Sequence, residues 1–159
     1  MNRSISAAAV LAMLALAASP APAADVSPLS LAQRDLAAET RGDVNAALAL
    51  YADDAIVQYG GLCWTPCAGK PAIQKELERR VAAKNRWKIV AKFINGNVAV
   101  VKTELQIGYI ESSGVDRVVV WNIYEAKAGK IATATLVGER TDPQTARFIE
   151  WIKAQPPSR

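Results

Sequence analysis

The sequence contains no histidine, only two cysteines, and few proline and glycine residues. Without histidine the chain cannot build a Ser-His-Asp or Cys-His nucleophile, an imidazole proton shuttle or a histidine-ligated metal site. Two cysteines are too few for a four-cysteine zinc site. Since 51% of the 159 residues are hydrophobic, with 8 prolines and 9 glycines, the composition is that of one globular domain and excludes low-complexity disorder.

Residues 1–23 have the pattern of a secretory signal peptide. Arg3 supplies a positive start, residues 5–18 form an apolar run that is short for a membrane span, and an Ala-x-Ala cleavage site ends at Ala23. A buried N-terminal helix is the alternative. Cleavage would remove Arg3 and lower the formal net charge of +4 by one. We therefore expect a periplasmic or secreted, mildly basic protein, with no nucleic-acid partner and no stable membrane insertion.

The two cysteines suit an oxidising compartment. Cys63 and Cys67 bracket three residues in a glycine-rich loop, and this spacing can bring their Cα atoms within disulfide range. Two free thiols are one alternative, and redox or metal chemistry is another, although redox pairs usually have two intervening residues. We predict a structural disulfide between Cys63 and Cys67.

The mature chain alternates helical and strand patterns after an extended lead at residues 24–29. The predicted helices are residues 30–41, residues 44–51, one that opens at Pro71, and one that begins at Pro143 with Asp142 as its N-cap. The predicted strands are residues 55–59, 87–94, 98–110, 115–125 and 131–139. Helices gathered at one end and strands at the other indicate an α+β fold, with helices on one face of an antiparallel sheet.

The strand at residues 115–125 is apolar on both faces. Val118, Val120, Asn122 and Tyr124 alternate with Arg117, Val119, Trp121 and Ile123. Because the helices can cover only one face, the other is left for a partner subunit or a lipid-like ligand. We expect a homodimer.

Three segments carry a resemblance to a known superfamily: residues 42–44, residues 47–57 and residues 69–73. With the strand order around them, they are similar to the nuclear transport factor 2-like superfamily, in its SnoaL-like and ketosteroid-isomerase-like branch, as an exported bacterial member. The resemblance spans residues 30–141 and leaves residues 142–159 as a C-terminal helix and tail. It implies a cone-shaped fold, in which a curved antiparallel sheet wraps around three N-terminal helices and encloses a pocket. It also implies a homodimer through the convex sheet face.

The resemblance implies which positions would act in a ketosteroid isomerase. The position of its base falls on Tyr59, the position of its sheet acid falls on Val120 or Trp121, and the first-helix tyrosine falls on Asp35. Base and sheet acid are therefore both missing, and ketosteroid isomerase activity is disfavoured. Asp53 and Asp54 match a motif that is structural in the superfamily, and an acid–base role is the alternative.

Asp35 is the best remaining candidate for an acid or base, together with Tyr59. Burial would raise the pKa of Asp35, whereas an exposed Asp35 would pair with Arg34 or Arg41. The candidate pocket residues combine aromatic side chains, which would form an apolar lining, with polar groups that would orient a ligand. Core packing is the alternative for each of them. They are Tyr59, Trp64, Trp87, Val120, Asn122 and Tyr124.

Residues 70–92 carry eight lysines and arginines against two glutamates. We interpret this stretch as a solvated helix face and a lysine-guarded strand edge, with Arg80 on the surface; an anion-binding surface is the alternative.

Three functions stay open. The first is a binding module for a small apolar molecule. The second is an isomerase, cyclase or hydratase of the SnoaL-like type that uses Asp35 and Tyr59. The third is a dimeric interaction subunit with a filled cone. No cofactor or metal is expected in any of them.

Overall fold

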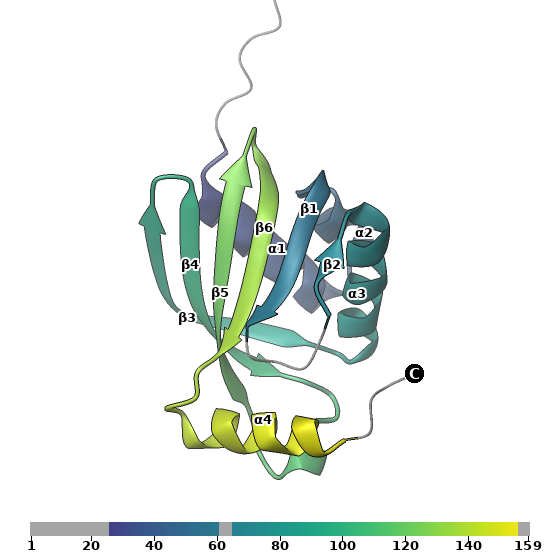
Figure 1. Cartoon of the computed structure of the whole chain (residues 1–159), viewed down its shortest axis with the longest axis vertical. Coiled ribbons are helices and arrows are strands. Elements are labelled where there is room, and N and C mark those ends of the chain that lie inside the picture. The colour runs from purple at the N-terminus through teal and green to yellow at the C-terminus, as the bar shows by residue number, and fades with distance from the viewer. Residues whose placement is uncertain (1–25, 61–64, 156–159) are drawn as a thin grey trace, which may run out of the picture.

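The computed structural model describes residues 26–60 and 65–155 (Figure 1). The predicted signal peptide, Cys63 and Trp64 lie outside these residues, so the predictions made for them stay predictions. The elements, in chain order, are α1 (Pro28–Arg41), α2 (Val44–Leu48), β1 (Tyr51–Gly60), β2 (Cys67–Ala68), α3 (Lys70–Ala82), β3 (Arg86–Asn95), β4 (Val98–Gln106), the 3₁₀ turn η1 (Ile110–Ser113), β5 (Val118–Lys127), β6 (Lys130–Gly138) and α4 (Pro143–Ala154). The predicted α+β class is confirmed.

The strands form one curved, unclosed sheet in the order β2-β1-β6-β5-β4-β3, which wraps around α1 (Figure 1). Strands β3 to β6 pair antiparallel, as predicted. The expectation of a wholly antiparallel sheet is wrong in one place, because β1 pairs parallel to β6. No hairpin connects these two strands, which are separated by α3 and three other long strands, so the chain is free to return in the same direction.

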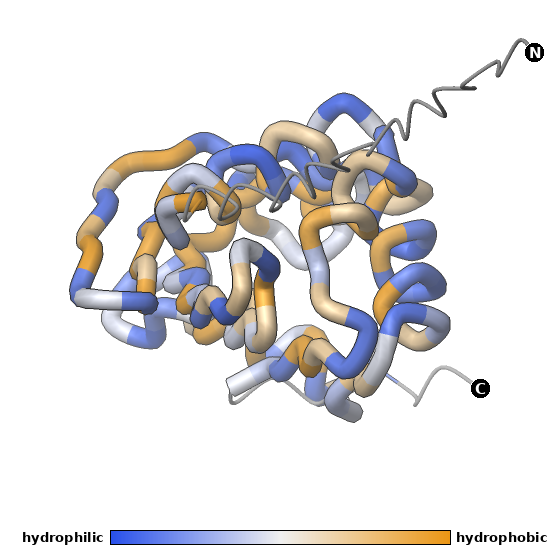
Figure 2. Tube along the Cα trace, turned by 90° about the horizontal axis from the view of Figure 1, so that it is seen from above, coloured by the Kyte–Doolittle hydropathy of each residue, from blue (hydrophilic) through white to orange (hydrophobic). Residues whose placement is uncertain are grey.

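The core lies between α1 and the inner face of the sheet. Leu31 and Leu36 on α1 are each 2% exposed, and Val101 and Ile131 on the sheet are fully buried. Burying one such side chain contributes about 1.5–3 kcal/mol. On β5 the side chains of Val118, Val120, Asn122 and Tyr124 are buried, whereas Trp121 and Ile123 on the other face are half-buried. Figure 2 shows hydrophobic and hydrophilic residues alternating along much of the tube.

Predicted boundaries were wrong at several elements: the strand predicted from residue 55 begins at Tyr51, and the strand predicted from residue 115 begins at Val118. The second helix ends at Leu48 instead of continuing to residue 51, and Tyr51 already begins β1. Tyr51 is 1% exposed and hydrogen bonds across the core, so tertiary contacts override its helical pattern. The strand predicted for residues 98–110 ends at Gln106, because the chain turns into η1, which contacts α4.

Helix α4 crosses one end of the cone, beneath the ends of the strands in Figure 1. Its start was predicted correctly: Oδ1 of Asp142 accepts a hydrogen bond from the Thr145 amide at 2.8 Å, and Pro143 follows the cap. Asp142 also pairs with Arg117 at 3.1 Å, which ties the start of α4 to the segment before β5. Within residues 26–60 and 65–155, no helix is both long and apolar enough to cross a membrane.

Candidate functional site

Helix α1 places two carboxylates inside the cone. Asp35 and Glu39 are four residues apart and therefore lie on the same face of the helix, which is turned toward the sheet. Asp35 is fully buried and Glu39 is 2% exposed. Each carboxylate needs hydrogen-bond partners in the core, since an isolated buried charge is strongly unfavourable.

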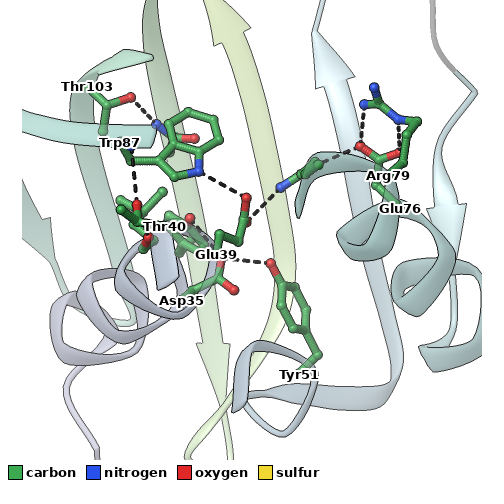
Figure 3. Close-up of polar contacts among 12 residues, drawn as sticks. Asp35, Glu39, Thr40, Tyr51, Glu76, Arg79, Trp87 and Thr103 are labelled. Atoms are coloured by element: carbon green, nitrogen blue, oxygen red, sulfur yellow. Dashed lines mark hydrogen bonds and ion pairs between the residues drawn. The ribbon is translucent and has the colours of Figure 1, made fainter. Parts of the chain in front are cut away.

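Asp35 is surrounded by tyrosines. The Tyr51 hydroxyl donates to its Oδ2 atom at 2.9 Å (Figure 3), and the Tyr124 hydroxyl donates to the same atom at 3.0 Å. Its Oδ1 atom has no hydrogen-bond partner among the described residues. Burial, and next the nearby Glu39 carboxylate, raise the pKa of Asp35 to about 8. Burial therefore favours the neutral form of the Asp35 carboxyl.

Glu39 is paired with a buried arginine. Nη1 of Arg80, which is 3% exposed, lies 2.9 Å from Oε1 of Glu39. The indole Nε1 of Trp87 donates to the other carboxylate oxygen at 3.0 Å (Figure 3). The interpretation of Arg80 as a surface residue is thus wrong, because its partner comes from α1, far away in the sequence.

A second glutamate completes this network. Two hydrogen bonds, at 2.7 and 2.8 Å, join Arg79 to Glu76, and Nε of Arg80 lies 2.9 Å from Glu76. Burial alone would raise the pKa of Glu76, but hydrogen bonds from Arg79 and the charge of Arg80 lower it to about 2. The Tyr59 hydroxyl donates to Glu76 and accepts from Arg80. We call Glu39, Glu76, Arg79 and Arg80 the ion-pair network; its two positive and two negative charges balance.

A cavity of about 40 Å³ lies between the inner face of the sheet and α4. Its volume is sufficient for a few water molecules. One wall is polar, and the remaining lining is mostly apolar. The polar wall consists of Tyr59, Arg79, Arg80, Asn85 and Trp87; the rest is formed by Leu105, Ile107, Tyr109, Val118, Val120, Leu136, Gly138, Thr145, Phe148 and Ile149.

The predicted pocket residues separate into two groups. Tyr59, Trp87 and Val120 line the cavity, whereas Asp35, Asn122 and Tyr124 are buried in the core outside its lining. Asn122 donates to the Thr103 hydroxyl at 2.8 Å and so links β5 to β4. Core packing, the alternative considered for each of these residues, describes Asn122 and Tyr124.

The proposed acid–base pair is not assembled at the cavity. Asp35 bonds to Tyr51 and Tyr124, whereas Tyr59 bonds to Glu76 and Arg80. Burial raises the pKa of Tyr59 well above its usual value, so its hydroxyl stays protonated at neutral pH and supplies no phenolate base. The alternative that Asp35 is an exposed helix acid is also wrong, because its side chain is fully buried.

Sequence reasoning missed Glu39, Arg80 and Asn85. A signal for Glu39 was present, since it follows Asp35 by four residues on an otherwise apolar face of α1. No local pattern marks Asn85, which lies just after α3. Among the described residues, no group of three histidine, cysteine, aspartate or glutamate side chains is arranged to hold a metal ion.

Comparisons with known proteins relate the chain to solved structures alone: no protein-family model and no curated protein matches it. An NTF2-like protein of unknown function from Cytophaga hutchinsonii has 12% identity and a TM-score of 0.59, over 73% of this chain and 93% of that one. The epoxide hydrolase/cyclase-like enzyme SalBIII, which acts in pyran ring formation in the polyether salinomycin, has 16% identity and a TM-score of 0.61, over 72% and 92%. A candidate ketosteroid isomerase from Kribbella flavida has 15% identity and a TM-score of 0.59, over 69% and 76%. The predicted nuclear transport factor 2-like cone fold is confirmed.

Proposed function

We propose that this protein binds a small, mostly apolar molecule in the cavity between the sheet and α4. The observation that carries the proposal is the lining: apolar side chains from three strands and α4 face one polar wall, in which Tyr59, Arg80 and Asn85 are buried. Small-molecule sites typically combine such an apolar surface with a few fixed polar groups that orient the ligand. From residues 1–23 we further propose that the protein is exported.

The cavity size restricts the ligand. Sites for drug-sized molecules enclose about 300–1,000 Å³, and this cavity has about 40 Å³. The ligand is therefore compact, or it enters as Phe148 and Ile149 of α4 move aside. A movement of α4 side chains needs less rearrangement than a movement of the hydrogen-bonded sheet, which forms the opposite wall.

Binding is preferred over the isomerase alternative. An acid or base must lie within hydrogen-bond reach of the substrate, or reach it through one water molecule. Asp35 is not part of the cavity lining, and the Tyr59 hydroxyl is engaged by Arg80 and Glu76. SalBIII and the candidate isomerase share the fold with this chain, and at 16% and 15% identity the likeness carries no activity over to it.

Filling the cavity should abolish binding. We expect Val120→Phe to weaken the binding of compact ring compounds, such as benzene, by roughly tenfold or more, because the added ring occupies the space that the ligand needs. Ligand-observed NMR titration measures the affinity. Ile123→Phe is the matched control, because Ile123 lies on the same strand and faces outward.

Folding is checked by circular dichroism. If Val120→Phe does not fold, Leu136→Phe on the neighbouring strand repeats the test, since Leu136 also lines the cavity. Equal affinities for wild type and a folded, filled variant would refute binding in this cavity.

We also propose that the protein forms a homodimer through the outer face of β3 to β5. Phe93 is 58% exposed and stacks on Trp121 with ring centroids 6.4 Å apart, which leaves an aromatic surface open to solvent. An exposed apolar surface of this kind marks an interaction site, and the resemblance implies the same face.

Phe93→Glu should convert the dimer to a monomer, because the new charge would be desolvated at the centre of the interface. Ser112→Glu, which adds the same charge to an exposed turn, should leave the dimer intact. Light scattering coupled to size-exclusion chromatography measures the mass. A monomeric wild type at high concentration would exclude this dimer.

A further inference from the structure

Asn85 is held in place by its backbone. It lies three residues after the end of α3 at Ala82 and follows Lys84, whose φ of 55° is in the left-handed region. The backbone N–H of Asn85 donates to the Arg80 carbonyl at 3.1 Å. The backbone N–H of Gly108 donates to the Ala83 carbonyl at 2.7 Å, which holds the segment between α3 and Asn85 against the chain after β4. The backbone therefore fixes where the Asn85 side chain begins.

Asn85 lines the cavity, borders a second hollow beside Glu39 and Lys84, and is only 8% exposed. Its Oδ1 atom is buried and has no hydrogen-bond partner among the described residues. An unpartnered buried acceptor is unfavourable, and such atoms are rare in folded proteins. A ligand whose hydrogen-bond donor reaches Oδ1 from the cavity would remove this penalty.

The other polar side chains of the wall already have partners. Arg79 and Arg80 are neutralised by Glu39 and Glu76 within the ion-pair network. Trp87 donates its indole N–H to Glu39. Because the wall carries balanced charges, it offers no net attraction to an anionic or cationic ligand.

We infer that the ligand is a compact, uncharged molecule with an N–H or O–H group, and that Oδ1 of Asn85 accepts the hydrogen bond from that group. This inference rests on the proposed binding function. It assigns Asn85 as the residue that determines specificity and the apolar lining as the source of the remaining affinity.

Pyrrole and furan test the inference, since the two five-membered rings are similar in size but only pyrrole has a donor. We expect the wild-type protein to bind pyrrole roughly tenfold more tightly than furan, measured by ligand-observed NMR titration. Equal affinities would overturn the inference and leave the proposed function standing. Binding of neither ring, with benzene also failing to bind, would overturn both.

Two substitutions test whether Asn85 causes the preference for pyrrole over furan. Asn85→Leu should remove the preference by weakening pyrrole binding while furan binding is kept. It should also raise the melting temperature of the ligand-free protein, because the buried oxygen without a partner among the described residues is gone. Asn85→Asp keeps an acceptor oxygen at the same position and should keep the preference for pyrrole. A preference that persists in folded Asn85→Leu would show that another group accepts the donor and would overturn the assignment.

Discussion

Arg80→Met is expected to lower the free energy of unfolding by about 3–5 kcal/mol, the range typical of breaking a buried ion pair by removing one partner. Methionine fills much of the space of the arginine stem and removes the charge. Glu39 would then be a buried carboxylate without its cationic partner, left with the hydrogen bond from Trp87. Tyr59 and Glu76 would each lose a hydrogen bond from the guanidinium group as well.

Arg79→Met is the matched control. Arg79 is the neighbouring residue on α3 and binds the same glutamate, but its side chain is 45% exposed. Solvent screens its charge, so we expect a loss of about 1 kcal/mol or less. Urea denaturation followed by tryptophan fluorescence measures both variants. Equal losses for the two variants would show that the buried pair adds nothing beyond an ordinary surface contact.

Local patterns were enough to predict most of the fold. The N-cap Asp142, the proline that opens α4 and the alternation along β5 each depend on neighbours within a few residues. The parallel pairing of β1 with β6 depends on where the chain returns after some 70 residues, for which short-range patterns carry no signal. The position of Tyr51 was misassigned for a related reason: its helical context is local, but its hydrogen-bond partner lies on α1.

The polar site was harder to predict than the apolar lining. Val120 and Trp87 were expected in the pocket because apolar and aromatic side chains on a strand face that points inward are buried there and form the lining of any cavity. Arg80 looked like one more charge on a basic helix, and only contact with Glu39, 41 residues earlier, explains why it is buried. Burial of a charged side chain depends on a partner, and the partner is fixed by tertiary structure.

Asp35→Asn is expected to stabilise the protein, and increasingly so as the pH rises from about 4 to 8. In the unfolded chain Asp35 releases its proton near its ordinary pKa of 3.8, whereas burial and Glu39 raise the pKa in the folded protein to about 8. Over this window the folded state holds a proton that the unfolded state has lost. Wild-type stability therefore falls by up to about 1.4 kcal/mol per pH unit and levels off above pH 8.

The asparagine variant removes this penalty and keeps the local geometry. Its amide oxygen can accept from Tyr51 and Tyr124 as Oδ2 of Asp35 does. Its NH2 group takes the place of Oδ1, the atom that has no partner among the described residues. We expect wild type and Asp35→Asn to have similar unfolding free energies near pH 4 and to differ by several kcal/mol at pH 8. Urea denaturation at each pH measures the difference.

Asp54→Asn provides the control, because Asp54 is an exposed carboxylate on β1 and its replacement should change stability by less than about 0.5 kcal/mol. A loss of stability in Asp35→Asn at pH 8 would show instead that the core needs a charged carboxylate at this position. In that case Asp35 would act as a third anion facing Arg80, next to Glu39 and Glu76, and the polar core would carry a net negative charge. The pH profile therefore decides whether Asp35 is a neutral hydrogen-bond acceptor for two tyrosines or a buried charge, a distinction that also determines whether it could release a proton in any reaction.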